Sequence, residues 1–205
     1  MLKETYFSLL AKYTSSQKLR QDFWLEIEQN YSRPKRHYHT LLHLEHLIQQ
    51  LESVKEKIQN WEAVLWSLYY HDIVYNSLST KNEEKSADLA EKRMKELSVP
   101  SLIIHFCRTH ILATKAHTPA SLPDTDYFTD ADLSILGQDW DTYFTYCKNV
   151  RKEFSVYPDF MYNPGRQKVL KYFLGMERIY KTDYFHHKLE TLARKNLAQE
   201  LYLLE

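Results

Sequence analysis

Residues 63–75 read AVLWSLYYHDIVY, the most apolar stretch of the chain, with His71 and Asp72 among its apolar residues. This pattern predicts a nearly unbroken apolar helix over about residues 61–74, too short to span a bilayer. Ionisable groups inside such a helix cost several kcal/mol unless they have a partner. A cation would be an efficient partner, and separate hydrogen bonds to structural groups are the alternative for the dipeptide alone.

Helical periodicity continues on both sides of this stretch, so the sequence predicts an all-α helical bundle in a single domain. Residues 116–127 are expected to form a loop. A short helix is expected from about Asp130 to Gly137, and another is expected to start at Asn163-Pro164. The remaining helices are expected at about residues 3–13, 16–30, 39–51, 61–74, 81–97, 100–114, 139–154 and 184–203.

Composition narrows the class of protein. Only three glycines occur, which argues against a turn-rich β fold and glycine-rich phosphate loops, and 43% of residues are apolar, which argues against disorder. Lys+Arg and Asp+Glu are both 27, so no net charge attracts nucleic acid or an acidic membrane. Cys107 and Cys147 are too few for a disulfide scaffold, and the first residues lack signal-peptide features. We therefore expect a cytoplasmic protein.

Four motifs carry the candidate chemistry: RHYHTLLHLEHL (36–47), SLYYHDIVY (67–75), ATKAH (113–117) and FTDADLSILG (128–137). An imidazole, an adjacent His-Asp pair and a later Asp make a mixed nitrogen and oxygen ligand set. Such a set suits divalent Mn, Fe, Co, Ni or Zn, and Mg less well. Four protein ligands around a six-coordinate ion leave positions for a water and a phosphate oxygen, which favours hydrolytic chemistry.

With these motifs the chain resembles the HD superfamily of metal-dependent phosphohydrolases, and more closely its small bacterial branch of predicted phosphohydrolases. The resemblance runs from RHYHTLLH through HDIVY, NEEKSA, ATKAH, DADLSILG and YNPGRQ to ARKNLAQEL. It implies an HD-type helical domain over residues 1–205, with a metal-binding core at about 31–154 and C-terminal helices at about 163–203 packed on it. The metal ligands that it implies are His43, His71, Asp72 and Asp132.

Other residues compete for the ligand roles. His39, His43 and His46 share a helix face by their spacing and could form a different site, although such extra histidines are more often surface or supporting residues. Asp130 could replace Asp132, but we favour Asp130 as the N-cap of the short helix.

Further histidines are candidates for a second metal. In two-metal members of the superfamily, extra histidines between the HD pair and the final Asp bind the second ion. His117 is the better candidate here and His110 the other, with His39 as a further supporting residue. An exposed loop histidine is the alternative for His117.

Two acidic residues are candidates for catalysis. Asp72 would orient the attacking water as well as bind the metal. Glu83 shares a helical stripe with Ala87, Ala90 and other apolar residues, which turns its carboxylate inward as a general acid or base. The spacing Thr80-x-x-Glu83 is equally typical of a capping box, so both interpretations of Glu83 remain open.

Three cations are candidates for phosphate binding. Lys115 stands beside His117, and Arg166 follows a predicted helix start, where exposed N–H groups also attract anions. Arg151 lies at the edge of an apolar stripe. The ordinary alternative for either arginine is a structural ion pair with Glu153 or another carboxylate.

The sequence thus predicts an enzyme that hydrolyses a phosphate ester or anhydride, perhaps of a nucleotide, with metal-activated water. Its partner would be a phosphorylated small molecule, with no nucleic-acid polymer and no membrane, and homo-oligomerisation is left open. One alternative is a non-catalytic protein that binds metal and nucleotide, because the Glu-Asp pair that follows HD in alarmone hydrolases is absent. The GYP signature of cyclic di-GMP phosphodiesterases is also absent after the HD pair, so that activity is not expected. A third is a di-iron oxygenase of the same superfamily, which would need a second ligand set.

Overall fold

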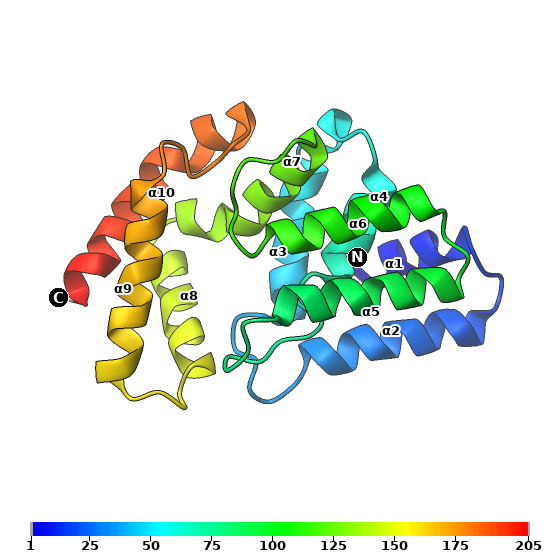
Figure 1. The fold of residues 1–205 in the computed structure, drawn as a ribbon, viewed down its shortest axis with the longest axis horizontal. Coiled ribbons are helices and arrows are strands. Elements are labelled where there is room, and N and C mark those ends of the chain that lie inside the picture. The colour runs from blue at the N-terminus through cyan, green and yellow to red at the C-terminus, as the bar shows by residue number, and fades with distance from the viewer. Residues whose placement is uncertain (1, 205) are drawn as a thin grey trace. The chain divides into compact units, whose positions relative to one another are not determined.

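The computed structural model describes residues 2–204, and these form helices joined by turns, with no β-strand among them (Figure 1). The predicted all-α class is confirmed. The chain divides into two compact units, one ending at Thr129 and the next beginning at Asp130. Their boundary lies inside helix α7, Pro123–Asp132.

The first unit is a bundle in which α4 packs on α5 and α6, and α5 and α6 pack on each other (Figure 1). Before α7, its elements are α1 (Leu2–Ala11), α2 (Gln17–Tyr31), α3 (Leu41–Glu52), the 3-10 turn η1 (Lys55–Lys57), α4 (Trp61–Tyr70), α5 (Asn82–Glu96) and α6 (Ser101–Ala113).

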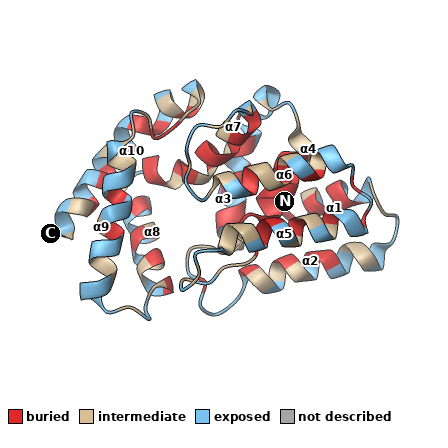
Figure 2. Ribbon diagram, viewed as in Figure 1, coloured by how far each residue is buried: buried red, intermediate tan, exposed pale blue. Residues whose placement is uncertain are grey.

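Helix α4 forms the centre of this bundle, and every residue from Ala63 to Tyr70 is buried. The Tyr6 ring of α1 meets Trp66 edge-on, with 6.2 Å between ring centroids. The hydroxyl groups of Tyr6 and Tyr70 lie 2.9 Å apart, so two buried polar groups satisfy each other. A helix that is apolar on all sides needs this central position. By contrast, α2 buries a single stripe and leaves its other residues exposed or half-buried (Figure 2).

The second unit begins with the last residues of α7. It then contains the 3-10 turn η2 (Leu133–Gly137), α8 (Trp140–Glu153), α9 (Asp159–Gly175) and α10 (Asp183–Leu203). Helix α10 packs against both η2 and α9. A Cβ atom on Gly137 would lie 2.6 Å from Cβ of Leu189, so only glycine allows η2 to approach α10 this closely.

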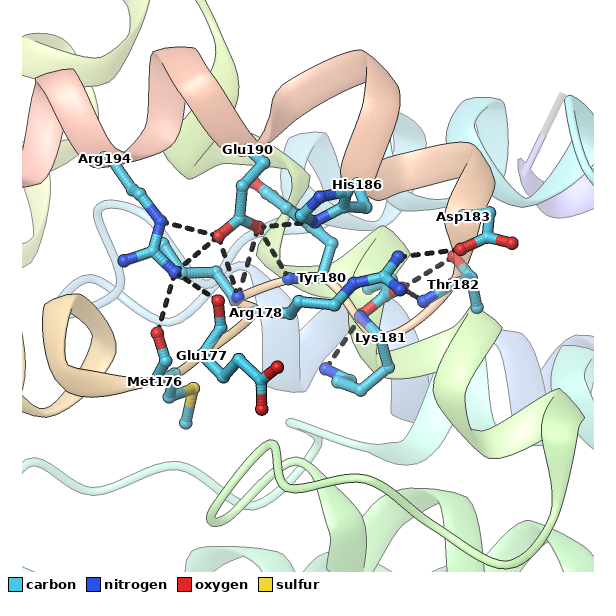
Figure 3. A network of polar contacts seen from close by, with 12 residues as sticks. Met176, Glu177, Arg178, Tyr180, Lys181, Thr182, Asp183, His186, Glu190 and Arg194 are labelled. Atoms are coloured by element: carbon cyan, nitrogen blue, oxygen red, sulfur yellow. Dashed lines mark hydrogen bonds and ion pairs between the residues drawn. The ribbon is translucent and has the colours of Figure 1, made fainter.

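Two buried carboxylates hold the connection between α9 and α10, and Figure 3 shows the contacts of one of them, Glu190. Glu190 accepts hydrogen bonds from the backbone N–H groups of Ile179 and Tyr180, at 3.1 Å each. Asp130 accepts from the N–H groups of Lys181 and Thr182, at 3.0 and 2.7 Å. Asp130 therefore fixes the backbone that leads into α10. Its predicted role as N-cap of a short helix is wrong, because it lies inside α7.

Two predicted helix boundaries are also wrong. Part of the expected loop at residues 116–127 is helical, because α7 begins at Pro123. Proline is well suited to the first position of a helix, and the Asp124 carboxylate anchors this turn by accepting from the N–H groups of Gln59 and Asn60. Helix α9 begins at Asp159, so Pro164 lies within it and does not mark its start.

Among the helices of residues 2–204, none combines the length and the apolar character that a bilayer-spanning segment needs.

Candidate metal centre

The first half of the site comes from the start of α3. His43 lies on the buried face of this helix and is 5% exposed, whereas His46 faces solvent. His39 precedes the helix, because Thr40 is its N-cap. The His39 ring stacks on Tyr75, with 4.3 Å between ring centroids. The structure thus separates the three histidines of this segment: His39 and His43 turn inward, and His46 does not.

The HD pair lies at the C-terminal end of α4 and not inside a longer helix as expected. The helix ends at Tyr70, and His71 is its C-cap. Nδ1 of His71 lies 3.1 Å from the carbonyl oxygen of Leu68, which the next helical hydrogen bond would use. The N–H of Asp72 instead donates to the hydroxyl of Tyr31, at 3.2 Å. Side-chain hydrogen bonds therefore replace the helical ladder at the HD pair.

The hydrogen bond of His71 also fixes its tautomer. A carbonyl oxygen only accepts, so Nδ1 must be the donor, and in the neutral ring Nε2 carries a lone pair. A backbone carbonyl that holds the outer nitrogen is the usual support of a metal-binding histidine. The Nε2 atoms of His43 and His71 face each other at 3.0 Å.

The ligand atoms around Asp72 are spaced as a common cation requires. Oδ2 of Asp72 lies 3.2 Å from Nε2 of His71, and 3.8 Å from Nε2 of both His43 and His39. Metal–nitrogen bonds of about 2.1 Å place ligand atoms about 3.0 Å apart at a right angle and about 4.2 Å apart when opposite. The three distances from Oδ2 of Asp72 fall within that range, so Asp72 and each of these histidines are spaced as two ligands of one divalent ion would be.

Asp132 forms a cluster with two of these histidines, and Asp72 is not part of that cluster. His43, His71 and Asp132 each offer a ligand atom, and these atoms lie within 4.8 Å of one another. Asp132 is the last residue of α7, and the earlier part of that helix is tied into the first unit. Thr125 hydrogen-bonds to Nδ1 of His110 at 2.8 Å, and the ring of Phe128 contacts that of His71.

Neighbouring imidazoles keep Asp72 ionised. Partial burial alone would raise the pKa of its carboxyl group, but the imidazoles of His71, His39 and His43 more than offset this and lower the pKa below its ordinary value. Its side chain is 18% exposed, so water reaches this edge of the site. The centre therefore combines an anionic carboxylate with imidazole nitrogens at a partly solvated position.

Glu83 lies at the start of α5, and its side chain is 25% exposed. The buried stripe predicted for this helix is present at Ala87 and Ala90. The capping box is not formed, because α5 begins at Asn82 and its N-cap is Lys81. The structural alternative for Glu83 is thus wrong, and its catalytic role remains a prediction.

Each predicted phosphate-binding cation already has a carboxylate partner. Lys115 forms an ion pair with Glu84 and lies 3.9 Å from Glu83. Arg166 holds the buried Glu200 through two N–H groups, at 2.8 and 2.9 Å.

Arg151 likewise contacts Asp159, at 2.7 Å. The alternative of a structural ion pair is therefore confirmed for both arginines, with Glu200 for Arg166 and Asp159 for Arg151.

The two histidines considered for a second ion differ in setting. His110 is buried, and burial lowers the pKa of its imidazole to about 4 although Asp124 partly offsets the shift. His117 follows the end of α6 in a left-handed backbone conformation, with φ of 52°. It lies beyond the end of the helix, which agrees with the end predicted at about Thr114.

Sequence reasoning missed Arg36, which ties the two halves of the centre together. Its guanidinium donates to the carbonyl oxygens of His39 and Ile73, at 3.0 and 2.8 Å. It also lies over the Tyr31 ring, 4.7 Å from the centroid. The only signal in the sequence is its place at the start of the RHYH motif.

In comparisons with known proteins, no family model, no curated protein and no solved structure matches the chain.

Proposed function

We propose that this protein is a metal-dependent phosphohydrolase of the HD type, acting on a phosphate ester or anhydride. The observation that supports the proposal best is the convergence of His43, His71 and Asp132 on a common point, with Asp72 beside both imidazoles. We propose that these four residues bind a divalent ion, for which Mn, Fe, Co, Ni, Zn and Mg are candidates. When bound, the ion would polarise a phosphate oxygen and lower the pKa of a coordinated water.

The protein's own residues would orient the reactants. Asp72 stays a carboxylate at neutral pH because its pKa is lowered, so it can accept a hydrogen bond from the attacking water. His71 is held in one tautomer by the Leu68 carbonyl, which keeps its Nε2 directed at the site. Glu83 is our candidate for proton transfer, since it lies at the start of a helix and is not used as a cap.

Lys115 is our candidate for the phosphate contact. Its partner Glu84 is 43% exposed, and exposed ion pairs contribute only about 0–1 kcal/mol. A substrate phosphate can therefore take the place of the Glu84 carboxylate at little cost. The substrate would be a small phosphorylated molecule such as a nucleotide, and the free thiols of Cys107 and Cys147 agree with a reducing, cytoplasmic setting.

The test is hydrolysis of a panel of nucleotides and phosphomonoesters with added Mn²⁺ or Ni²⁺. We expect turnover by the wild type and its loss in Asp72→Ala. Asp141→Ala removes an exposed aspartate of α8 and serves as the matched control, with activity unchanged. Equal turnover in the wild type and Asp72→Ala would refute the proposal.

A second candidate is a protein that binds metal and nucleotide without turnover. It is favoured by one observation: Ile73 and Val74 follow the HD pair, where alarmone hydrolases carry a Glu-Asp pair. Tight nucleotide binding that needs metal and yields no product over hours would support this function over hydrolysis.

A further inference from the structure

The second unit contains a cavity of about 430 Å³ that none of the proposed chemistry uses. It lies among the C-terminal half of α8, the start of α9 and the end of α10. A volume of this size is typical of sites for small organic ligands. Its lining consists of Phe144, Cys147, Lys148, Arg151, Lys152, Asp159, Tyr162, Asn163, Glu200, Leu203 and Leu204.

Two lysines of this lining are not paired with a carboxylate that the structure describes. Glu200 is neutralised by Arg166, and Asp159 by Arg151. Within residues 2–204, neither Lys148 nor Lys152 has a carboxylate within ion-pair distance. Both lysines are exposed, one helical turn apart on α8. The cavity therefore has a positive edge that its own acids do not compensate.

The remaining walls are aromatic and aliphatic. The ammonium group of Lys148 lies 4.9 Å from the centroid of the Phe144 ring, and the guanidinium of Arg151 lies 4.6 Å from that of Tyr162. Leu203 contributes an aliphatic side chain that is 57% exposed. A ligand with a flat apolar body could lie against these rings and place an acidic group at the lysines.

One residue of the lining, Glu200, belongs to a closed polar network. Arg166 and Glu200 are each less than one-tenth exposed and joined by two hydrogen bonds, and the hydroxyl of Tyr143 donates to the same carboxylate. Such a closed network holds the wall formed by α10 in one position. A preformed cavity needs little ordering when a ligand binds.

We infer that this cavity is a binding site for a small organic anion that carries a carboxylate, sulfonate or phosphate on an aromatic or aliphatic body. Lys148 and Lys152 would contact the acidic group, and Phe144, Tyr162 and Leu203 the apolar body. The site is built from the second unit alone, so this inference does not depend on the proposed hydrolase activity.

The experiment titrates the full chain with 1-anilinonaphthalene-8-sulfonate and follows the fluorescence of the probe. We expect saturable binding that weakens by about fivefold in the double variant Lys148→Gln/Lys152→Gln, from the loss of two exposed charge contacts. The matched control is Lys168→Gln/Lys171→Gln, which removes two exposed lysines of α9 outside the cavity and should bind the probe as the wild type does. Equal weakening in both double variants, or in neither, would overturn the inference.

Two further arms test the chemistry of the ligand. The neutral analogue 1-anilinonaphthalene has the same rings without the sulfonate and should bind roughly tenfold more weakly. Leu203→Asp places a negative charge at the rim and should also weaken binding of the sulfonate, whereas Leu192→Asp, elsewhere on α10, should not. Equal affinity for both probes, or binding to phosphatidylglycerol vesicles without binding of the soluble probe, would contradict the inference.

Discussion

Asp72 and Glu200 are both carboxylates of helical units with lowered pKa values, yet their surroundings differ in kind. Glu200 is completed by the permanently charged guanidinium of Arg166 and by a tyrosine hydroxyl, with both ion-pair partners less than one-tenth exposed. Asp72 is more exposed and faces imidazole nitrogens at 3.2–3.8 Å. A carboxylate completed by arginine is a structural centre. One surrounded by histidines has the composition of a metal site.

The largest expected effect tests the structural centre. Glu200→Gln would leave the buried charge of Arg166 without its counterion, and we expect the free energy of unfolding to fall by about 3–5 kcal/mol. Urea unfolding followed by circular dichroism measures this loss. The double variant Arg166→Met/Glu200→Leu removes both charges and should recover most of the stability. A loss below about 1 kcal/mol in the single variant would show that the pair is not structural.

His110 is a buried titratable group whose charged form is disfavoured by burial. Its pKa is about 4 when folded and about 6.5 when unfolded, so the unfolded chain binds more protons between these values. Stability should therefore fall as pH decreases from about 6.5 to 4, by about 3 kcal/mol from this group. Urea unfolding as a function of pH should give a flatter curve for His110→Gln. Parallel curves for the two proteins would contradict the low pKa.

Metal should stabilise the first unit through the Asp72 centre. An ion present at a hundredfold its Kd should add about 2.7 kcal/mol to the free energy of unfolding, because it binds only the folded chain. Thermal unfolding with Mn²⁺ and with EDTA measures the difference, which Asp72→Asn should abolish. Asp88→Asn changes an exposed aspartate of α5 and should keep the full response. The same response in both variants would place the ion elsewhere.

The smallest effect concerns the end of α4. Tyr31→Phe removes the hydroxyl that accepts from the N–H of Asp72, and we expect a loss of about 1 kcal/mol in unfolding free energy. Metal affinity should fall as well, because the HD turn loses a support. Unchanged stability together with unchanged affinity would mean that Tyr31 does not position Asp72.

The sequence predicts the fold best where apolar periodicity is strong. The buried stripe of α5, with Ala87 and Ala90, and the largely apolar α4 follow directly from side-chain spacing. The end of α4 does not, because it depends on a hydrogen bond from the N–H of Asp72 to the hydroxyl of Tyr31, which is distant in the sequence. Asp130 was misassigned for the same reason: its partners are backbone groups of residues 181 and 182.

In the candidate site too, contacts between residues distant in the sequence could not be predicted. The resemblance to the HD superfamily implies His43, His71 and Asp132 as ligands, and the structure brings their ligand atoms together. The sequence does not distinguish an arginine that binds phosphate from one that holds a carboxylate, because Arg166 and Glu200 come from different helices. The role of Arg36 could not be predicted from the sequence, because its hydrogen bonds go to backbone carbonyls and such contacts leave no pattern of side chains.

The most direct test of the central claim is the metal content of the purified chain, prepared without chelator and measured by elemental analysis. The account predicts at least one divalent ion per wild-type chain and its loss in His43→Ala. The control His46→Ala, which changes the exposed histidine one turn further along the same helix, should retain the ion. Wild-type protein without metal, or equal metal in the wild type and His43→Ala, would contradict the account.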